Sequence, residues 1–369
     1  MNKVSEEVLW IWLGELGSGY KTVYQDLIKA FGTAEKVWEA ETPELMPDTV
    51  ATKKKLAEKI ADPYLREKAY DIEHKAKLNE GKITYFTKAD YPKNLKEIYM
   101  PPAVLYYYGT LPEIKNPSMP LISVVGARGC SQYGSRCAFK LSAELAYLGV
   151  GIVSGMARGS DSRAHEGALT AGGYTLAVLG GGADVIYPYE NLHLYYKIKE
   201  FGCVMSEYPP GTTPNKYYFP MRNRIIAGLS DGLIVCEAAA SSGTMITVER
   251  AIEENRTIFA LPGNIDSALS EGTNNLLKRC AVCCTDYKDV IRELGYKTDK
   301  VPPKKLLESI TGLEGTNLAV AKAIEKGNNT PDKIQQATGL KFSEILNAIT
   351  ILEIKGVITR RKSGGFEVG

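Results

Sequence analysis

Arginines flanked by glycines follow two apolar runs in the middle of the chain. Gly126-Ala-Arg-Gly129 comes directly after Leu121–Val125, and Gly155-Met-Ala-Arg-Gly159 comes directly after Val150–Ser154. Glycine lets a backbone approach an anion closely, and a guanidinium group binds phosphate through paired hydrogen bonds. The chemistry open to these segments is therefore phosphate binding. The candidate contacts are Gly126, Arg128, Gly155, Arg158 and Gly159.

A third cationic segment combines basic and aromatic side chains. Its residues of interest are Lys216, Tyr217, Tyr218, Arg222, Asn223 and Arg224. Aromatic rings stack on the bases of a single strand of nucleic acid, and cations pair with its phosphates. Arg222 and Arg224 are two positions apart at the start of an expected helix, so they point to different faces. We expect one to contact the ligand and the other to form a buried network with Glu207 or Glu237.

Ser241-Ser-Gly-Thr244 precedes another expected helix. Backbone and hydroxyl donors at a helix N-terminus form a site for an anion, with Ser242, Gly243 and Thr244 as the contacts. Capping of the helix by a hydroxyl group explains the same residues nearly as well.

A nucleotide cofactor does not fit these glycines. The spacing from Gly126 to Gly134 departs from GxGxxG, and the second strand ends at Ser154 rather than at an acid that could hold a ribose. The chain has no GK[ST] after a strand. We therefore expect no stored NAD or ATP, and no cofactor.

Two groups could be read as chemical centres. Asp161 and His165 lie one helical turn apart, but a capping aspartate and a buried histidine explain them better than an acid–base pair, so we assign no catalytic residue. The CxxC in Cys280–Cys284 lacks a second ligand pair, and the histidines are scattered. We expect small buried side chains on a strand here, and no metal.

The elements that position these residues alternate along the chain. From residue 121, short β-branched runs, glycine loops and amphipathic stretches follow one another, as in a parallel sheet covered by helices on both faces. The carboxyl ends of such strands meet at one edge, where ligands bind. The expected strands are Leu121–Val125, Val150–Ser154, Tyr174–Leu179, Cys203–Ser206, Leu233–Cys236 and Thr257–Leu261.

Proline clusters divide the chain into further segments. Residues 1–110 are rich in helix formers, residues 111–120 carry three prolines, and a second proline and lysine cluster begins at Lys300. The end of the chain fits a helix from Thr330 to Gly339, a second helix and a hairpin, which together suggest a winged helix. Its wing contacts to DNA would be Arg360, Arg361 and Lys362, although such units also bind proteins.

Composition limits the remaining possibilities. The net charge is only +2, so any claim of nucleic-acid binding depends on local pattern. The sequence shows no signal segment, no apolar run of membrane-spanning length and an odd number of scattered cysteines. We expect a cytoplasmic protein without membrane contacts.

Taken together, the motifs resemble the DNA-processing protein A (DprA, or Smf) family. The matching stretches are Val125–Gly134, Ser154–His165, Leu179–Pro188 with Asn191, Ser206–Gly211, Phe219–Ser230, Glu237–Thr247 and Leu261–Gly263. Leu13–Trp38 is similar to the family's N-terminal helices, which are like a sterile alpha motif. The stretch from Tyr91 to Gly109 is similar to the family's lead-in to its sheet.

The resemblance implies an α/β fold with a Rossmann-like, open and mostly parallel sheet. We expect a helical domain and lead-in at 1–110, a Rossmann-like domain at 119–295, a linker at 296–317 and a winged helix at 318–369. The implied function is non-enzymatic: binding of single-stranded DNA and help in loading the RecA recombinase onto it, as in recombination and natural transformation. The implied assembly is a homodimer formed through the Rossmann-like domain.

Two departures from the family pattern stand out. Ser160 replaces the usual Ile after the second arginine–glycine pair, and Tyr189 stands where some relatives carry a basic residue. Tyr189 could stack on a base there instead of pairing with a phosphate.

An enzyme with the same sheet architecture is the alternative: a nucleotide phosphoribohydrolase of the lysine-decarboxylase-like (LOG) group. Those enzymes place a catalytic acid shortly after a PGGxGT loop. Here Ser241–Thr244 lacks the double glycine, and Glu249 lies too far along the helix. The resemblance to that group is one of fold alone.

Overall fold

The computed structural model describes residues 4–17, 22–40, 53–78, 80–302, 315–354, 357–360 and 365–368. Its centre is a nine-stranded sheet in the order β1-β2-β6-β5-β4-β3-β7-β8-β9. The strands are β1 Lys82–Tyr85, β2 Val104–Gly109, β3 Leu121–Val125, β4 Gly151–Ser154, β5 Thr175–Val178, β6 Cys203–Ser206, β7 Gly232–Val235, β8 Thr257–Ala260 and β9 Val282–Cys283. The six strands expected from the sequence are confirmed, with ends that differ by one residue at most.

The sheet is doubly wound. From β3 the chain adds β4, β5 and β6 in parallel on one side, and then returns to add β7, β8 and β9 in parallel on the other. The strand order therefore reverses between β3 and β7, which is the place where ligands bind in open sheets of this kind.

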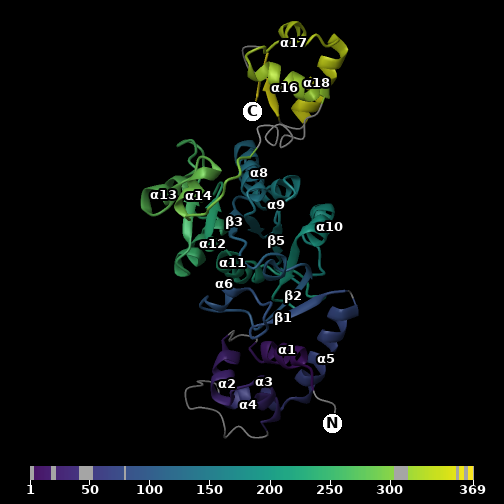
Figure 1. Cartoon of the computed structure of the whole chain (residues 1–369), viewed down its shortest axis with the longest axis vertical. Helices are drawn as coiled ribbons and strands as arrows, with labels where there is room; N and C mark the ends of the chain where they lie inside the picture. The colour runs from purple at the N-terminus through teal and green to yellow at the C-terminus, as the bar shows by residue number, and fades with distance from the viewer. Residues whose placement is uncertain are drawn as a thin grey trace.

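Helices cover both faces of this sheet (Figure 1). One face packs against α8 (Gln132–Tyr147), α9 (Ser160–Thr170), α10 (Leu192–Phe201) and α14 (Tyr287–Glu293), and the other against α6 (Lys93–Lys96), α11 (Tyr218–Leu229), α12 (Gly243–Glu253) and α13 (Glu271–Arg279). In β3, Ile122 and Val124 face the first set while Leu121 and Val125 face the second. Because both faces are covered, the central strands are apolar without alternation.

The lead-in joins the sheet instead of standing apart from it. β2 pairs antiparallel with β6, and β1 pairs antiparallel with β2, so the sheet begins before the expected boundary at residue 119. The proline-rich stretch 111–120, expected to be a linker, holds the short helix α7 (Pro112–Lys115) and the fully buried Leu111. Proline at the first helical position favours the start of this short helix.

The N-terminal helices form a separate layer below the sheet in Figure 1. They are α1 (Glu6–Leu16), α2 (Val23–Phe31), α3 (Ala34–Glu39), α4 (Lys53–Ala61) and α5 (Pro63–Leu78). Trp10 and Trp12 of α1 are almost fully buried in their core. That core also takes in Ile83 and Tyr106 from β1 and β2, which ties the helices to the sheet.

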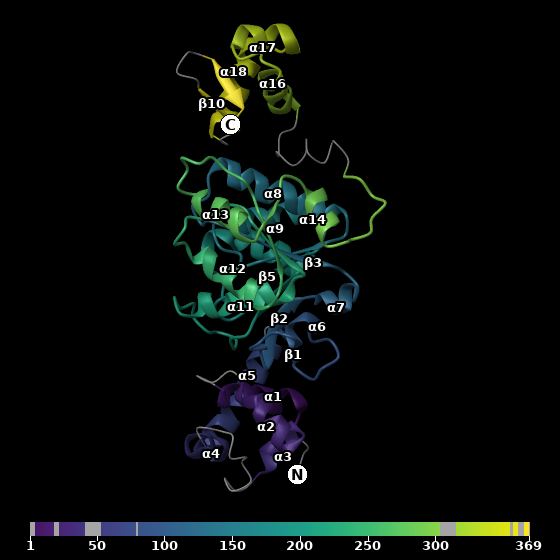
Figure 2. The ribbon, with the colours of Figure 1, turned by 90° about the vertical axis from the view of Figure 1, so that its left-hand side faces the viewer.

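The C-terminal residues form a unit with its own core (Figure 2). α16 (Gly315–Glu325) precedes α17 (Pro331–Thr338) and α18 (Phe342–Ile354), and β10 (Ile358–Arg360) pairs antiparallel with β11 (Phe366–Val368). The expected helix, second helix and hairpin are therefore present, preceded by a helix that the sequence pattern did not indicate.

One expectation about the cysteines is wrong. Cys284 is buried, but Cys280 and Cys283 are exposed, because β9 is a two-residue strand at the edge of the sheet and Cys280 lies just beyond α13. Within the described residues, no helix has the length and apolar character needed to cross a membrane.

Candidate nucleic-acid interface

A pocket of about 720 Å³ opens at the carboxyl ends of β3 and β7, where the strand order reverses. Its wall includes Val125 at the end of β3 and Ala239 beyond the end of β7. The predicted site residues that line it are Gly126, Arg128, Lys216, Arg222, Asn223, Ser242, Gly243 and Thr244. Tertiary structure thus brings together three segments that lie far apart in the sequence.

Two guanidinium groups approach one aromatic ring in this pocket. The Cζ atom of Arg128 lies 5.3 Å from the centroid of the Phe219 ring, and that of Arg222 lies 5.9 Å from it. Such distances allow cation–π attraction. Among the described residues that line the wall, Asp161 is the single carboxylate, so cations outnumber anions there. An anion entering it would meet a net positive charge.

Arg222 is held by backbone carbonyls. Its Nη1 donates to the carbonyl of Gly155 at 2.9 Å and to that of Val178, and its Nε donates to Oδ1 of Asn223 at 3.1 Å. Burial lowers the pKa of Arg222 to about 10, an effect that Asp161 opposes and Arg128 reinforces. The group therefore stays charged at neutral pH, at a fixed place in the wall.

The structure distinguishes the two arginines of α11, for which the sequence predicted one structural role and one ligand contact. Both are buried: Arg222 is 4% exposed and Arg224 is 2% exposed. Nη2 of Arg224 forms an ion pair with Oε1 of Glu207, as expected for the structural member of the pair. Arg224 does not line the pocket, and in this conformation it offers no exposed cation to DNA.

Glu237, the other acid expected to pair with an arginine of α11, instead accepts hydrogen bonds next to the first glycine loop. Its two carboxylate oxygens accept hydrogen bonds from the backbone N–H and the hydroxyl of Ser131 at 2.7 and 2.6 Å. A side chain at Gly134 would collide with this carboxylate, at 2.2 Å. Glu237 therefore fixes the loop that carries Arg128.

The glycines of the second loop serve packing. A Cβ at Gly155 would come within 2.5 Å of the Arg222 guanidinium, and one at Gly159 (φ +76°) within 2.4 Å of the carbonyl of Ala127. The sequence predicted that glycine is needed at these positions so that the backbone can approach another group closely. That group is another part of this chain and not a bound anion. Gly155 and Gly159 do not line the pocket.

Arg158 and Tyr189 also lie outside the pocket wall. Arg158 forms an exposed ion pair with Glu190. Tyr189 begins the short helix η2 (Tyr189–Asn191) and is 73% exposed, so its ring is available for stacking.

Two aromatic residues of the pocket were missed as site residues. Phe219 lines it beneath the two arginines, and Tyr187 lines it with its ring 5.7 Å from that of Phe219. Tyr217 and Tyr218, which the sequence favoured, do not line the pocket; Tyr218 instead stacks on Tyr208 at 4.1 Å. Phe219 could have been found from the sequence, because a residue three positions before Arg222 on the same helix lies next to it.

The N-terminus of α12 faces the same pocket through Ser242, Gly243 and Thr244. Ser242 precedes the helix in an extended conformation, but its side chain makes no capping hydrogen bond. Its Oγ is buried without a partner among the described residues. The capping explanation therefore fails here, and the free donors of the helix remain available to an anion.

Asp161 and His165 do not form a bonded pair. Oδ2 of Asp161 accepts from the N–H groups of Gly155 and Ala157 at 3.2 and 3.3 Å, whereas Nδ1 of His165 lies 2.7 Å from Oγ1 of Thr175. His165 is fully buried. Asp161 stabilises the second glycine loop, and His165 fills the space under α9.

The buried His165 predicts a specific pH dependence. Burial lowers its pKa to about 3 from an ordinary 6.5, with Arg222 adding to the effect. This histidine takes up a proton below pH 6.5 in the unfolded chain and not in the folded chain. Its contribution to stability is therefore full above that pH and falls by about 1.4 kcal/mol per pH unit below it. Urea unfolding between pH 7 and 5 measures this.

A comparison of variants isolates the histidine. Burial raises the pKa of Glu144 to about 7, which makes its contribution change in the opposite direction over this range. Between pH 6.5 and 5, His165→Gln should lack the fall in the free energy of unfolding that the histidine contributes in the parent protein. Substitution of the exposed His193 by Gln should leave the pH profile of the parent unchanged. Identical pH profiles for the parent and His165→Gln would contradict the assignment.

The predicted wing contacts are only partly covered by the structure. Arg360 pairs through Nε with Oε1 of Glu353 at 2.9 Å, and its guanidinium lies 5.5 Å from the Phe366 ring. Arg361 and Lys362 lie outside the described residues. A DNA contact by the wing therefore stays a prediction.

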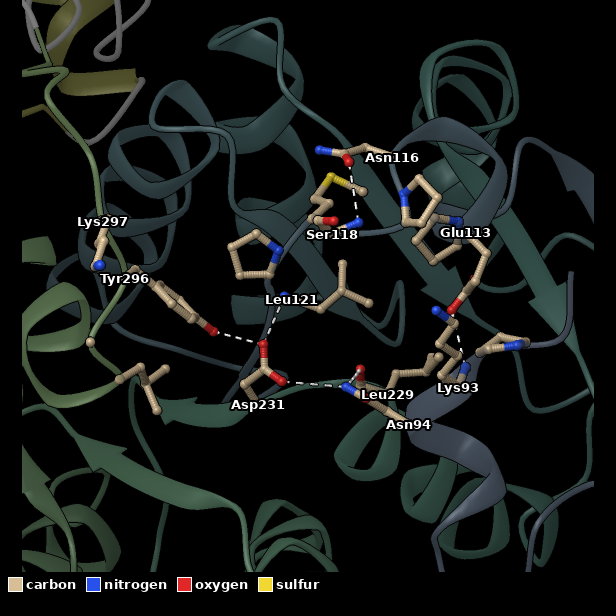
Figure 3. Close-up of a pocket in the computed structure, with 17 residues that line it drawn as sticks. Lys93, Asn94, Glu113, Asn116, Ser118, Leu121, Leu229, Asp231, Tyr296 and Lys297 are labelled. Atoms are coloured by element: carbon tan, nitrogen blue, oxygen red, sulfur yellow. Dashed lines mark hydrogen bonds between the residues drawn. The ribbon is translucent and has the colours of Figure 1, made fainter.

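A second cavity, of about 690 Å³, lies at the opposite edge of the sheet (Figure 3). Its walls meet at Asp231, whose carboxylate accepts from the Leu121 N–H at 3.3 Å, the Tyr296 hydroxyl at 2.8 Å and the Asn94 amide at 3.4 Å. These bonds join the lead-in, β3 and the segment after α14. None of the predicted site residues lines this cavity.

A doubly wound sheet with a cationic, aromatic pocket at its switch point defines a Rossmann-like anion-binding protein. The chain matches the family described as DNA recombination-mediator protein A over residues 82–295, more than half of its length. It is 46% identical over 206 residues to DNA processing protein DprA of Streptococcus pneumoniae, covering 56% of this chain and 72% of that one. It is 30% identical over 387 aligned positions to Protein Smf of Synechocystis, covering 96% and 97%. The chain belongs to the DNA recombination-mediator protein A family.

Solved structures agree with this assignment. The X-ray structure of S. pneumoniae DprA matches with a TM-score of 0.67 at 33% identity, covering 79% of this chain and 98% of that one. A structure of DNA processing protein A from Helicobacter pylori, described as showing its single-stranded DNA binding mode, matches with a TM-score of 0.53 at 30% identity, covering 59% and 97%. The resemblance inferred from the motifs is confirmed, and the phosphoribohydrolase alternative is not favoured.

Proposed function

We propose that the protein binds single-stranded DNA in the pocket at the switch point and acts as a recombination mediator without catalysis of its own. One observation carries the proposal. Arg128 and Arg222 lie around the Phe219 ring, in the same pocket that the N-terminal N–H groups of α12 face. Cations and helix donors suit phosphates, and exposed rings suit unpaired bases.

The shape of the pocket supports a polymer over a mononucleotide. Its wall combines two aromatic rings with cations drawn from separate loops, and it has no acid placed to hold a ribose. Its single carboxylate, Asp161, is already committed to two backbone N–H groups. A strand can place phosphates and bases along such a wall in succession.

Further elements of the proposal come from the family resemblance. The protein would form a homodimer through its Rossmann-like domain, pass the strand to the RecA recombinase and work in the cytoplasm. The boundaries 1–110, 119–295 and 318–369 remain the proposed domains, with the lead-in strands completing the central sheet. Light scattering and co-purification with RecA in the presence of oligonucleotide test these elements.

Salt-titrated binding tests the central proposal. Labelled oligothymidine, the corresponding duplex and a nucleoside monophosphate are compared with full-length protein. We expect the single strand to bind most tightly, with log affinity falling linearly with log salt because counterions are released. Release of free base from a nucleoside monophosphate, or equal affinity for the monophosphate and the oligonucleotide, would overturn it.

Replacing Phe219 with Leu tests the stacking contribution. The change keeps an apolar side chain in the pocket but removes the aromatic face, so affinity for oligothymidine should fall about tenfold, the range of one base stack. The salt dependence should stay that of the parent protein, because every cation of the pocket is retained. A shallower salt dependence would instead mean that the substitution had displaced Arg128 or Arg222.

A further inference from the structure

The ion pair between Arg158 and Glu190 lies next to the pocket without forming part of its wall. Arg158 follows Ala157, which lines the pocket, and Glu190 lies three residues after Tyr187, which also lines it. Both charged side chains are well exposed, at 64% and 61%. A strand that extends from the pocket past Ala157 or Tyr187 would therefore pass near this pair.

The segments that carry the two charges are joined independently of the ion pair. Nδ2 of Asn191 donates to the carbonyl of Met156 at 2.8 Å and to Oγ of Ser162 at 2.9 Å. η2 thus stays attached to the second glycine loop even when Arg158 and Glu190 separate. Glu190 therefore stays close to Arg158 whether the ion pair between them is formed or broken.

A cation in the pocket wall, Lys216, has no such neighbour among the described residues. Lys216 lies over the ring of Tyr217 at 5.1 Å and forms no ion pair with any described residue. Arg158 likewise has an exposed tyrosine nearby, Tyr189, one residue before Glu190. Of these two cations, only Arg158 is neutralised by a described carboxylate.

We propose that Glu190 masks Arg158, competing with DNA phosphate for the guanidinium group and so limiting the affinity of the site. The proposal rests on the proposed function of the pocket. An exposed ion pair contributes little stability, so a phosphate can replace the carboxylate at small cost. Because η2 stays anchored, Glu190 remains close enough to repel the bound phosphate. When the strand dissociates, the ion pair between Glu190 and Arg158 forms again.

Four proteins test this in a double-mutant cycle: the parent, Glu190→Gln, Arg158→Ala and the double variant, each titrated with labelled oligothymidine. Glu190→Gln should bind about fivefold more tightly, and its log–log salt dependence should steepen by about 0.7, the value for one more neutralised phosphate in a single strand. Arg158→Ala should not tighten binding, because it removes a cation and leaves the Glu190 carboxylate in place. Adding Glu190→Gln to Arg158→Ala should raise the affinity by less than about twofold, because no guanidinium group is released to phosphate.

Two control variants remove simpler explanations. Glu166→Gln takes a carboxylate from another exposed pair, with Arg163 on α9, and should leave the affinity near that of the parent. Glu190→Asp keeps the charge and should retain the masking. Unchanged thermal unfolding of Glu190→Gln shows that η2 is intact.

Three results would overturn the masking: Glu190→Gln binds no more tightly than the parent, Glu166→Gln gains as much, or the gain persists in the Arg158→Ala background. A parent protein that fails to bind oligothymidine would overturn the proposed function itself. The two failures are therefore distinguishable.

Discussion

Arg128→Glu is expected to lower the affinity for single-stranded DNA by at least about tenfold and to reduce the log–log salt dependence by about 0.7 for each phosphate that is no longer neutralised. Arg128 is exposed, lines the pocket and forms no ion pair with any described residue, so its charge is free for a ligand. The glutamate replaces a phosphate-binding cation with a repelling anion beside the Phe219 ring, whose centroid lies 5.3 Å from the Arg128 guanidinium carbon. Fluorescence anisotropy at several salt concentrations measures both quantities.

Arg292→Glu is the matched control for this prediction. Its guanidinium is 73% exposed on α14, pairs with Asp289 on the same helix and is not part of the pocket. The two variants have the same net charge, so a difference between them reports the position of the charge. An equal fall in affinity for both would mean that only the total charge of the protein matters, which would contradict the pocket.

Arg224→Met is expected to lower the free energy of unfolding by about 3 kcal/mol, because it removes the buried cation that pairs with Oε1 of Glu207. The side chains of this pair are 3% and 14% exposed, so solvent screens them little. Methionine fills most of the volume of the arginine stem, which keeps the effect of a cavity small. Urea unfolding at neutral pH measures the destabilisation.

The double variant Arg224→Met/Glu207→Gln separates the ion pair from simple packing. Removing both charges also takes away the buried carboxylate that Arg224 no longer balances, so about half or more of the lost stability should be recovered. Folded Arg224→Met should bind oligothymidine within about threefold of the parent, since buried Arg224 is a structural group. A tenfold weakening of binding with unchanged stability would show that Arg224 contacts the strand after all.

These two arginines show where inference from sequence reached its limit. The sequence proposed both Arg128 and Arg224 as candidate contacts, and it offered Glu207 or Glu237 as the structural partner of one arginine of α11. The structure shows that the partner is Glu207. The sequence could not show that Arg222 is buried as well, because the carbonyls that bind Arg222 belong to residues 155 and 178. Those residues lie 67 and 44 positions away in the chain.

Arg158 illustrates the same limit at the surface. Its position between glycines at a strand end indicated an exposed cation, and the structure shows that the side chain is exposed. The carboxylate that occupies it comes from η2, which a separate turn of the chain brings back to the loop. No local pattern in either segment indicates that pairing.

The strands, the helices between them and the edge of the sheet where the glycine and arginine loops meet could all be predicted from the sequence. This was possible because apolar runs, helix caps and glycine turns depend on neighbouring residues, and parallel strands place their carboxyl ends together. Tertiary structure alone decided which cations stay free, that Phe219 and Tyr187 complete the pocket, and that the lead-in strands extend the sheet. The physical reason is that the charge state and exposure of a side chain depend on partners from distant segments, which only the packed fold brings together.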